Sequence, residues 1–237
     1  MTKPASGSIE PVHLPTVTKP RFSACGAGAL LMDVSEGSFD LRTQQHLWFL
    51  TAKGGPVERL RGVRNAVLGI NNVLFAFDPL IADLPELQNS LEDAWSRSAP
   101  HEGTGRVLEV PVAYDTSPGS ELEGIARHVR LSIDEVIRLH TSEEYHVACI
   151  GSVPGFAYLV GLPPRLAVPR RQTPRARVPK GSVAIGGAQT GVIPTDMPSG
   201  WHMLGMTELD MFDSLRAEPC LLAPGDRIRF SARGAAS

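Results

Sequence analysis

The chain has 237 residues, of which 42% are hydrophobic and 20% are charged, and its formal net charge is −2. These values are ordinary for a globular protein of one large or two ordinary domains, and the weak charge excludes a general attraction to nucleic acid or anionic membranes. The three cysteines, Cys25, Cys149 and Cys220, lie far apart with no C-x-x-C pair, which indicates reduced thiols and a cytoplasmic location.

Both ends of the chain predict tails. No apolar run approaches the roughly 20 residues of a membrane span. Residues 1–21 combine Pro, Ser, Thr and Lys and lack the apolar segment of a signal peptide, so a disordered tail is expected there. A second, short tail is expected over 233–237.

The residues after the first tail predict an alternation of strands and helices. Ala29–Val34 is a short apolar run that suits a buried strand, and 40–52 places apolar residues at a loosely helical spacing. Val63–Leu68 and Val73–Phe77 are strand-like runs joined by Ile70-Asn71-Asn72. Because Asn tolerates left-handed backbone, these two runs predict a hairpin.

A second helix and a last strand complete this pattern. Four apolar residues between Leu84 and Trp95 recur at helical spacing and predict a helix, and Arg106–Val112 predicts a strand. The resulting β-α-β-β-α-β order is typical of a ferredoxin-like unit. We therefore expect a ferredoxin-like domain over 22–105.

The second half of the chain predicts a few short helices and many strands. A pair of short helices is expected over 121–140, where Ser132 and Glu135 form the S-x-x-E pattern of a capping box. One or two helical turns are expected over 208–215, and a tight turn is expected at Pro224-Gly225-Asp226. Strands are expected over 145–150, 156–159, 166–168, 183–185 and 227–230.

The stretch Gly151–Trp201 is interrupted by Pro or Gly every few residues. Interior prolines remove a backbone donor and clash with the preceding helical turn, so a long helix is incompatible with this stretch. Short β-prone runs between turn residues instead favour a compact β fold. We expect a closed β-barrel domain over 106–232, and hence an α+β protein.

Three motifs of common active sites are incomplete in this chain. Gly186-Gly187 and Gly191 resemble a phosphate loop, but Val192-Ile193-Pro194 follows in place of a helix, so a β-turn is expected. The seven histidines show no H-E-x-x-H spacing and no Cys/His cluster, so no bound metal is expected. The sequence has no G-x-S-x-G, which leaves an elbow serine nucleophile without support.

Four arginines lie within eight positions and are flanked by prolines. Rigid backbone holds such guanidinium groups in place for bidentate binding of a carboxylate or phosphate. The alternative is a solvated basic loop, since charged side chains are mostly exposed. The four residues are Arg170, Arg171, Arg175 and Arg177.

A series of motifs runs through this half of the chain in a fixed order. They are PGF-x-YL (Pro154–Leu159), PR-x3-PR (Pro169–Arg175), P-x-GSVAI (Pro179–Ile185), QTG (Gln189–Gly191), P-x-GW (Pro198–Trp201) and PGD-x-x-RF (Pro224–Phe230). The series resembles the KipI family, also named allophanate hydrolase subunit 1 or the B-type subunit of 5-oxoprolinase. The similarity covers roughly 22–230 and implies an N-terminal ferredoxin-like domain followed by a cyclophilin-like β-barrel.

The resemblance also implies partners and a reaction. Family members pair with a C-type (KipA-like) subunit, and in 5-oxoprolinase these two act with a third, A-type subunit. That complex uses ATP to open the lactam of 5-oxoproline to glutamate, so the chain is expected to be its B-type subunit and to be inactive alone. Two alternatives stay open. One is a carboxyltransferase component like that of urea carboxylase, and the other is a KipI-like inhibitor of a histidine kinase.

The sequence departs from the family pattern at four positions. Ser152 stands where an aromatic residue is usual, and Ile193 stands in place of Tyr. Ser199 replaces the first Gly of a Gly-Gly-Trp turn, and Met206 replaces Arg or Lys, so one positive charge is lost. If that charge helps to bind an anionic substrate, the departures imply an altered function.

An ATP-dependent, lactam-opening site must hold phosphates and a substrate carboxylate together. By this resemblance, Arg170 and Arg175 are the expected anion-binding residues, and ATP is expected as a substrate of the complex. Arg171 and Arg177 are expected to be surface charges.

Five further residues are candidates for the mouth of the barrel, where small-ligand sites often lie. Gln189 and Thr190 either contact the ligand or stabilise a turn. Trp201, with His202 beside it, and Phe156 either wall the pocket or pack in the core.

Overall fold

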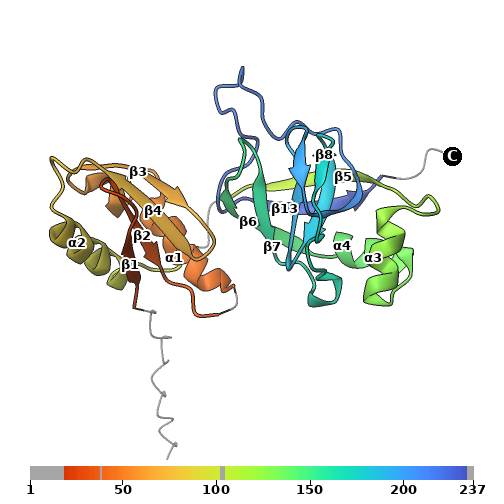
Figure 1. Cartoon of the computed structure of the whole chain (residues 1–237), viewed down its shortest axis with the longest axis horizontal. Coiled ribbons are helices and arrows are strands. Elements are labelled where there is room, and N and C mark those ends of the chain that lie inside the picture. Colours follow the sequence, from red (N-terminus) through yellow and green to blue (C-terminus); the bar gives the residue numbers. More distant parts are fainter. Residues whose placement is uncertain (1–18, 38, 102–104, 234–237) are drawn as a thin grey trace, which may run out of the picture.

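The computed structural model describes residues 19–37, 39–101 and 105–233, which form an N-terminal α/β part and a β-barrel side by side (Figure 1). Most of the two expected tails, 1–18 and 234–237, lies outside the described residues. The inner ends of both tail predictions are wrong. Arg21 already belongs to the first strand, and Arg233 donates its backbone N–H to the carbonyl of Val112 (2.8 Å).

The N-terminal part is an antiparallel sheet with two helices. Its elements are β1 (Arg21–Ala24), β2 (Ala29–Asp33), α1 (Leu41–Thr51), the 3-10 helix η1 (Pro56–Arg59), β3 (Val63–Leu68), β4 (Asn72–Phe77) and α2 (Leu84–Ser96). The strand order is β1-β2-β4-β3. Every second residue of β2 and β4 is buried, and these residues form one core with Leu47 and Leu50 of α1 and Leu91 of α2.

The predicted β-α-β-β-α-β order is wrong at both ends of this unit. β1 is an additional strand at the sheet edge, so the order is β-β-α-β-β-α. The stretch 106–112 does form a strand, β5 (Val107–Tyr114), but β5 pairs with strands of the barrel. Pairing with partners far along the chain leaves no trace in the local sequence, which is why the strand is predictable and its sheet is not.

The local signals of the N-terminal part are confirmed. The hairpin between β3 and β4 turns through Asn71, whose φ of 54° is the left-handed backbone that Asn tolerates. Asp40 caps α1 and Asp83 caps α2, because each carboxylate accepts a hydrogen bond from a backbone N–H in the first helical turn. Short-range chemistry thus sets where these elements begin.

The second part is a closed barrel of seven strands in the order β10-β7-β6-β13-β5-β12-β9, with β9 pairing back to β10. β13 runs parallel to β5 and antiparallel to β6, so the last barrel strand in the sequence lies between the first two. Besides β5, the strands are β6 (Glu144–Ile150), β7 (Ala157–Val160), β9 (Ser182–Gly186), β10 (Gln189–Val192), β12 (His202–Met206) and β13 (Arg227–Ala232).

Two helices cover the barrel on the side away from the N-terminal part (Figure 1). α3 (Glu121–Val129) packs against β12, and α4 (Ile133–Thr141) packs against β13, as the expected pair of short helices. The capping box of Ser132 and Glu135 is present with both of its hydrogen bonds. Beside the barrel, β8 (Arg175–Val178) and β11 (Met197–Ser199) form a separate two-stranded ribbon.

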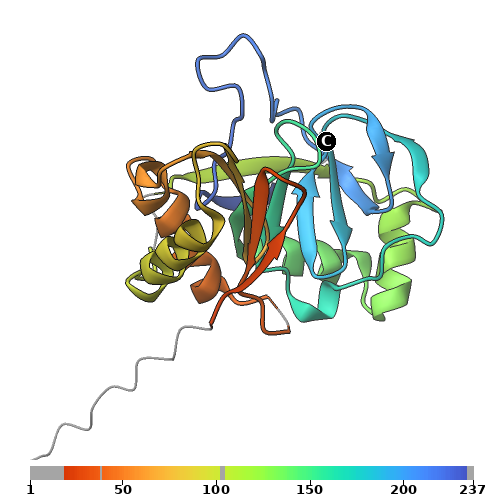
Figure 2. The same cartoon turned by 60° about the vertical axis from the view of Figure 1, so that its left-hand side comes forward.

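Two stretches of the second half differ from their predictions. Of the expected strand 166–168, Leu166 ends the 3-10 helix η2 (Pro164–Leu166), and Val168 makes only an isolated bridge to Gly187. The stretch 208–215 forms no helical turn and belongs to an irregular loop between β12 and β13 that extends away from the barrel (Figures 1 and 2). Backbone groups of this loop bond to one another, for example Leu221 N to Met211 O (2.8 Å).

The glycine pair that resembles a phosphate loop is a hairpin turn, as expected. β9 and β10 are joined at Gly187, whose φ of 63° is left-handed backbone. The turn therefore continues the barrel wall.

One backbone carbonyl of the barrel accepts two hydrogen bonds from the N-terminal part. A β-bulge between Val147 and Cys149 takes Ala148 out of the ladder between β6 and β7. The carbonyl of Ala148 accepts hydrogen bonds from Nε2 of Gln44 (3.1 Å) and Nε1 of Trp48 (2.9 Å), both on α1. These bonds hold α1 against the barrel.

Candidate functional site

A cavity of about 480 Å³ lies at the lip of the barrel, between the start of α3 and the segment Pro169–Arg171. We call it the barrel-lip cavity. Its volume suits a small organic ligand. The polar and charged side chains that line it are Ser120, Glu121, His128, Arg170, Arg171 and His202.

Two arginines stand at this cavity in different settings. Arg170 is exposed, and its guanidinium carbon lies 5.7 Å from the centre of the Trp201 ring, within cation–π distance. The backbone N–H of Arg171 donates to the carbonyl of Gly200 (2.8 Å), which ties the arginine segment to the turn before Trp201. Arg171 is exposed, as expected of a surface charge, and it also lines the cavity.

Glu121 is the carboxylate that organises these cations. It is the first residue of α3, and it forms ion pairs with Arg175 and, more loosely, with Arg171 (3.9 Å). Its other oxygen accepts from the backbone N–H of Met203 (2.9 Å). The Arg175 side chain is only 21% exposed, and burial lowers its pKa from the ordinary value. Glu121 thus fixes Arg175 behind the cavity rather than in it.

His202 contributes a neutral imidazole to the same cavity. Its Nε2 lies 3.0 Å from the carbonyl oxygen of Pro169, so Nε2 carries a proton and donates it. Burial lowers the pKa of His202, and the nearby Arg171 and Arg175 lower it further. The imidazole therefore stays uncharged at neutral pH, and Nδ1 is left as an acceptor.

Trp201 and Phe156 pack in a small hydrophobic cluster beneath the lip. Their rings meet edge to face at 5.4 Å, and both side chains are about 5% exposed or less. The Trp201 ring lies so close to Gly186 that a Cβ there would approach it to 2.7 Å. Of the two roles left open by the sequence, core packing accounts for Phe156, while Trp201 also carries Arg170 on its outer face.

Thr190 belongs to a hydrogen-bonded chain inside the barrel. Its hydroxyl donates to the carbonyl of Ala184 (3.1 Å) and so accepts from Nε2 of His140 (3.0 Å). Nδ1 of His140 is then an acceptor for the hydroxyl of Tyr114 (2.7 Å). His140 is fully buried, and burial lowers its pKa to about 3. This series of hydrogen bonds is neutral and links α4 to three strands of the barrel wall.

The remaining candidates lie outside the cavity. Gln189 is half-buried at the start of β10, opposite Gly186. Arg177 pairs with Asp196 on the surface, as expected for a surface charge. The structure therefore brings Arg170 and His202 together at the cavity, with Trp201 and Arg175 behind them, and places Gln189, Thr190 and Phe156 elsewhere.

Sequence reasoning missed two residues of this region. In the sequence, Glu121 stands out only as an acidic residue that follows a possible helix cap, Ser120. Its ion-pair partner Arg175 lies far along the chain, so the pair is not visible locally. His140 is one of seven histidines, and its burial depends on strands that come later in the sequence.

Comparison with known proteins places the chain in a family. The model of the carboxyltransferase domain, subdomain C and D, matches residues 20–222. The chain belongs to this family. It is 39% identical over 206 residues to the B-type subunit of 5-oxoprolinase from Escherichia coli O157:H7, a match that covers 86% of this chain and 92% of that protein. The resemblance indicated by the motifs is confirmed.

Solved structures share the fold. The crystal structure of TTHA0988 matches with a TM-score of 0.72 and 32% identity over 87% of this chain, which spans only 40% of that one. The urea carboxylase of Kluyveromyces lactis matches with a TM-score of 0.71 over 90% of this chain and 22% of its own. At 20% identity, that second likeness concerns the fold alone.

Two further observations concern the described residues. Nowhere in 19–37, 39–101 or 105–233 do three or more His, Cys, Asp or Glu side chains gather in a way that suits a metal ion. The helices in these same ranges are too short or too polar to traverse a bilayer.

Proposed function

We propose that this chain is the B-type subunit of an ATP-dependent 5-oxoprolinase and works in complex with C-type and A-type subunits. The observation that carries the proposal is the 39% identity to the B-type subunit from E. coli across 92% of that protein. The barrel-lip cavity adds a chemical reason. Arg170 and Arg171 favour a small carboxylate at that place, and Glu121, a carboxylate of the same lining, is itself paired with Arg175.

Opening a lactam requires activation of an unreactive amide. In the proposed reaction the lactam oxygen attacks the terminal phosphorus of ATP, and ADP leaves. Water then adds at the activated carbon, the ring C–N bond breaks, and a second water releases phosphate to leave glutamate. The role of this chain would be to hold the substrate carboxylate and the lactam in place, because orientation supplies a large part of such a rate enhancement.

The candidate residues take different roles in this proposal. Arg170 would bind the carboxylate, and Nδ1 of His202 would accept a hydrogen bond from the lactam N–H. Arg175 and Trp201 would act as positioning residues, through Glu121 and Arg170 respectively. Phe156, Gln189 and Thr190 would support the barrel lip. The C-type subunit would complete the cavity and hold the phosphates.

Reconstitution tests the proposal. The purified chain alone should release no glutamate from 5-oxoproline, and the chain mixed with its C-type and A-type partners should release it in an ATP-dependent manner. Arg170→Met should raise KM for 5-oxoproline at least tenfold, whereas Arg177→Met, which removes an exposed cation paired with Asp196, should leave KM unchanged. No glutamate release with all three subunits present would overturn the proposal.

The family description favours a second candidate function, that of a carboxyltransferase component. In that case the chain and its C-type partner would transfer a carboxyl group to or from biotin carried on another protein. Transfer of labelled bicarbonate through a biotinylated carrier, with no glutamate formed, would favour this function over the first.

We also propose finer limits for the two parts and a cytoplasmic location. The N-terminal domain would span 22–105, with Arg21 added by its place in β1, as a variant of the ferredoxin-like unit. A cyclophilin-like barrel domain would span 106–232, with Arg233 added by its bond to Val112. Limited proteolysis should then cut near 105 before it degrades either part. A first cut inside the barrel would contradict this division.

A further inference from the structure

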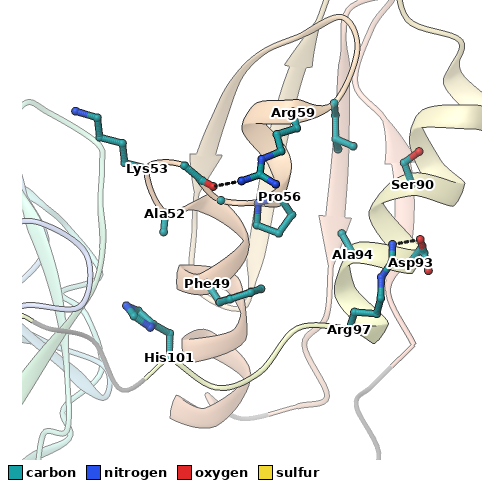
Figure 3. Close-up of a pocket in the computed structure, with 13 residues that line it drawn as sticks. Phe49, Ala52, Lys53, Pro56, Arg59, Ser90, Asp93, Ala94, Arg97 and His101 are labelled. Carbon is teal, nitrogen blue, oxygen red and sulfur yellow. Dashed lines mark hydrogen bonds and ion pairs between the residues drawn. The ribbon is translucent and has the colours of Figure 1, made fainter.

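A second cavity, of about 700 Å³, lies in the N-terminal part, between the C-terminal halves of α1 and α2 (Figure 3). We call it the α1–α2 cavity. Phe49 of α1, Pro56 of η1 and Ala94 of α2 point into the gap between the helices (Figure 3), and Leu60 also lines it. The volume and the apolar floor suit a small organic ligand. The proposed 5-oxoprolinase activity makes no use of this cavity.

The rim of the α1–α2 cavity is cationic. Arg59 stands on η1, and Arg97, the residue after α2, stands opposite it (Figure 3). Lys53 also lines the cavity, and its side chain extends away from the gap between the helices (Figure 3). Asp93 is the one carboxylate among the described lining residues, so the rim carries two positive charges in excess. A ligand with two negative charges would neutralise it.

Both arginines are free to turn towards a ligand at small cost. Arg97 pairs with Asp93, but their side chains are 72% and 56% exposed, and exposed pairs of this kind contribute little to stability. Nη2 of Arg59 donates only a long hydrogen bond, of 3.5 Å, to the carbonyl of Gly54. Neither guanidinium is held by a buried carboxylate, in contrast to Arg175 at the barrel lip.

The helix ends decide which atoms a ligand would meet. α1 and α2 both end at this cavity, and carbonyl groups at helix C-termini carry partial negative charge. An anion would therefore avoid the backbone and contact the long cationic side chains. Its apolar remainder would lie over Phe49, which is half-buried, and over the buried Ala94.

We propose that the α1–α2 cavity binds an organic dianion with an aromatic or aliphatic body, in which Arg59 and Arg97 contact the charged group from opposite sides. A phosphate monoester and a dicarboxylate both have this chemistry, and two probes distinguish them. Phenyl phosphate represents the first source and phthalate the second.

Calorimetric titration of the full chain tests the proposal. At least one of the two probes should bind one site per chain, at least tenfold more tightly than inorganic phosphate, which lacks the apolar body, or phenol, which lacks the charge. Equal affinity for phenyl phosphate and inorganic phosphate would show a mere charge effect and overturn the proposal. Absence of saturable binding by both probes at millimolar concentration would also overturn it.

Variants then assign the binding to this cavity. Arg59→Met should weaken the affinity for the probe at least tenfold. Because the Arg59 side chain is exposed, this substitution preserves folding. Ala94→Leu should fill the floor and abolish binding with both arginines intact. Arg64→Met is the matched control, because Arg64 is an exposed arginine of the same sheet that pairs with Asp78. Unchanged affinity in Arg59→Met, or an equal loss in Arg64→Met, would overturn the assignment.

Discussion

The two cavities of this protein hold their cations in opposite ways. At the barrel lip, Arg175 is mostly buried against Glu121, and Glu121 is itself anchored by the backbone of Met203. In the α1–α2 cavity, Arg59 and Arg97 are exposed and only loosely bonded. Arg170 at the barrel lip is exposed as well, so the difference lies in the fixed ion pair of Arg175 and Glu121 behind that cavity. Arg59 and Arg97 have no buried carboxylate behind them and must arrange their charges around a ligand. Preorganised groups favour tight and selective contacts.

The largest expected effect is on the acid stability of the protein, because His140 is buried inside the barrel. The folded state keeps His140 neutral down to a pKa of about 3, whereas an unfolded His titrates near 6.5. Between these two values the unfolded state binds a proton that the folded state does not. The free energy of unfolding should therefore fall by about 1.4 kcal/mol per pH unit as the pH drops below 6.5, and His140 should cause no pH dependence above that value.

Urea unfolding between pH 7 and pH 4 measures this slope. His140→Asn should lower stability throughout and should also flatten the slope by about 1.4 kcal/mol per pH unit. His128→Asn, at an exposed histidine of α3, is the matched control variant. An identical slope in His140→Asn and the wild type would show that another group carries the acid sensitivity.

The next largest effect concerns Glu121. Its replacement by Ala leaves Arg175 without a carboxylate, and the two side chains are only 27% and 21% exposed. Allowing for partial screening by solvent, we expect a loss of about 2 kcal/mol in the free energy of unfolding. Arg127→Ala, on the same helix, removes an exposed pair with Glu123 and should cost less than about 0.5 kcal/mol. Chemical denaturation of both variants checks this, and equal losses would mean that Arg175 needs no fixed partner.

A smaller effect is expected at the joint between the two parts. Trp48→Phe removes one of the two donors to Ala148 while Gln44 still satisfies that carbonyl. The free energy of unfolding should fall by about 1 kcal/mol, the usual contribution of one hydrogen bond. Gln45→Ala, at the next residue of the same helix after Gln44, is the control and should change stability less. A loss of several kcal/mol would indicate that the two parts fold only together.

The smallest effect belongs to the α1–α2 cavity. Arg97→Met removes an exposed pair with Asp93, so stability should change by less than about 0.5 kcal/mol. Thermal unfolding without ligand checks this. A change as large as that of Glu121→Ala would erase the contrast between the two cavities.

Much of the fold could be predicted from the sequence where the cause is local. The left-handed backbone at Asn71 and the capping box of Ser132 and Glu135 depend on residues within four positions of one another, and both are present. The sheet to which β5 belongs could not be predicted, because β13 pairs with it from the other end of the chain. β1 carries little signal, since its four residues are short of apolar groups and lie at an exposed edge.

The candidate site shows the same division between local and distant causes. The Pro-Arg pattern points to Arg170, which does line a cavity, because rigid backbone around it is a local property. The pattern does not separate Arg170 from Arg175, since the difference is made by Glu121, about fifty residues earlier in the chain. Thr190 is prominent in a family motif, yet its hydroxyl is bonded to Ala184 and His140.

The position of β13 has a consequence for biosynthesis. β13 pairs with both β5 and β6, yet it follows every other strand of the barrel in sequence. On the ribosome, the N-terminal sheet can assemble as soon as it emerges, whereas the barrel wall has a gap until β13 is made. A nascent chain stalled before residue 227 would expose the edges of β5 and β6, so chaperones should bind that stalled chain and release it once β13 is complete.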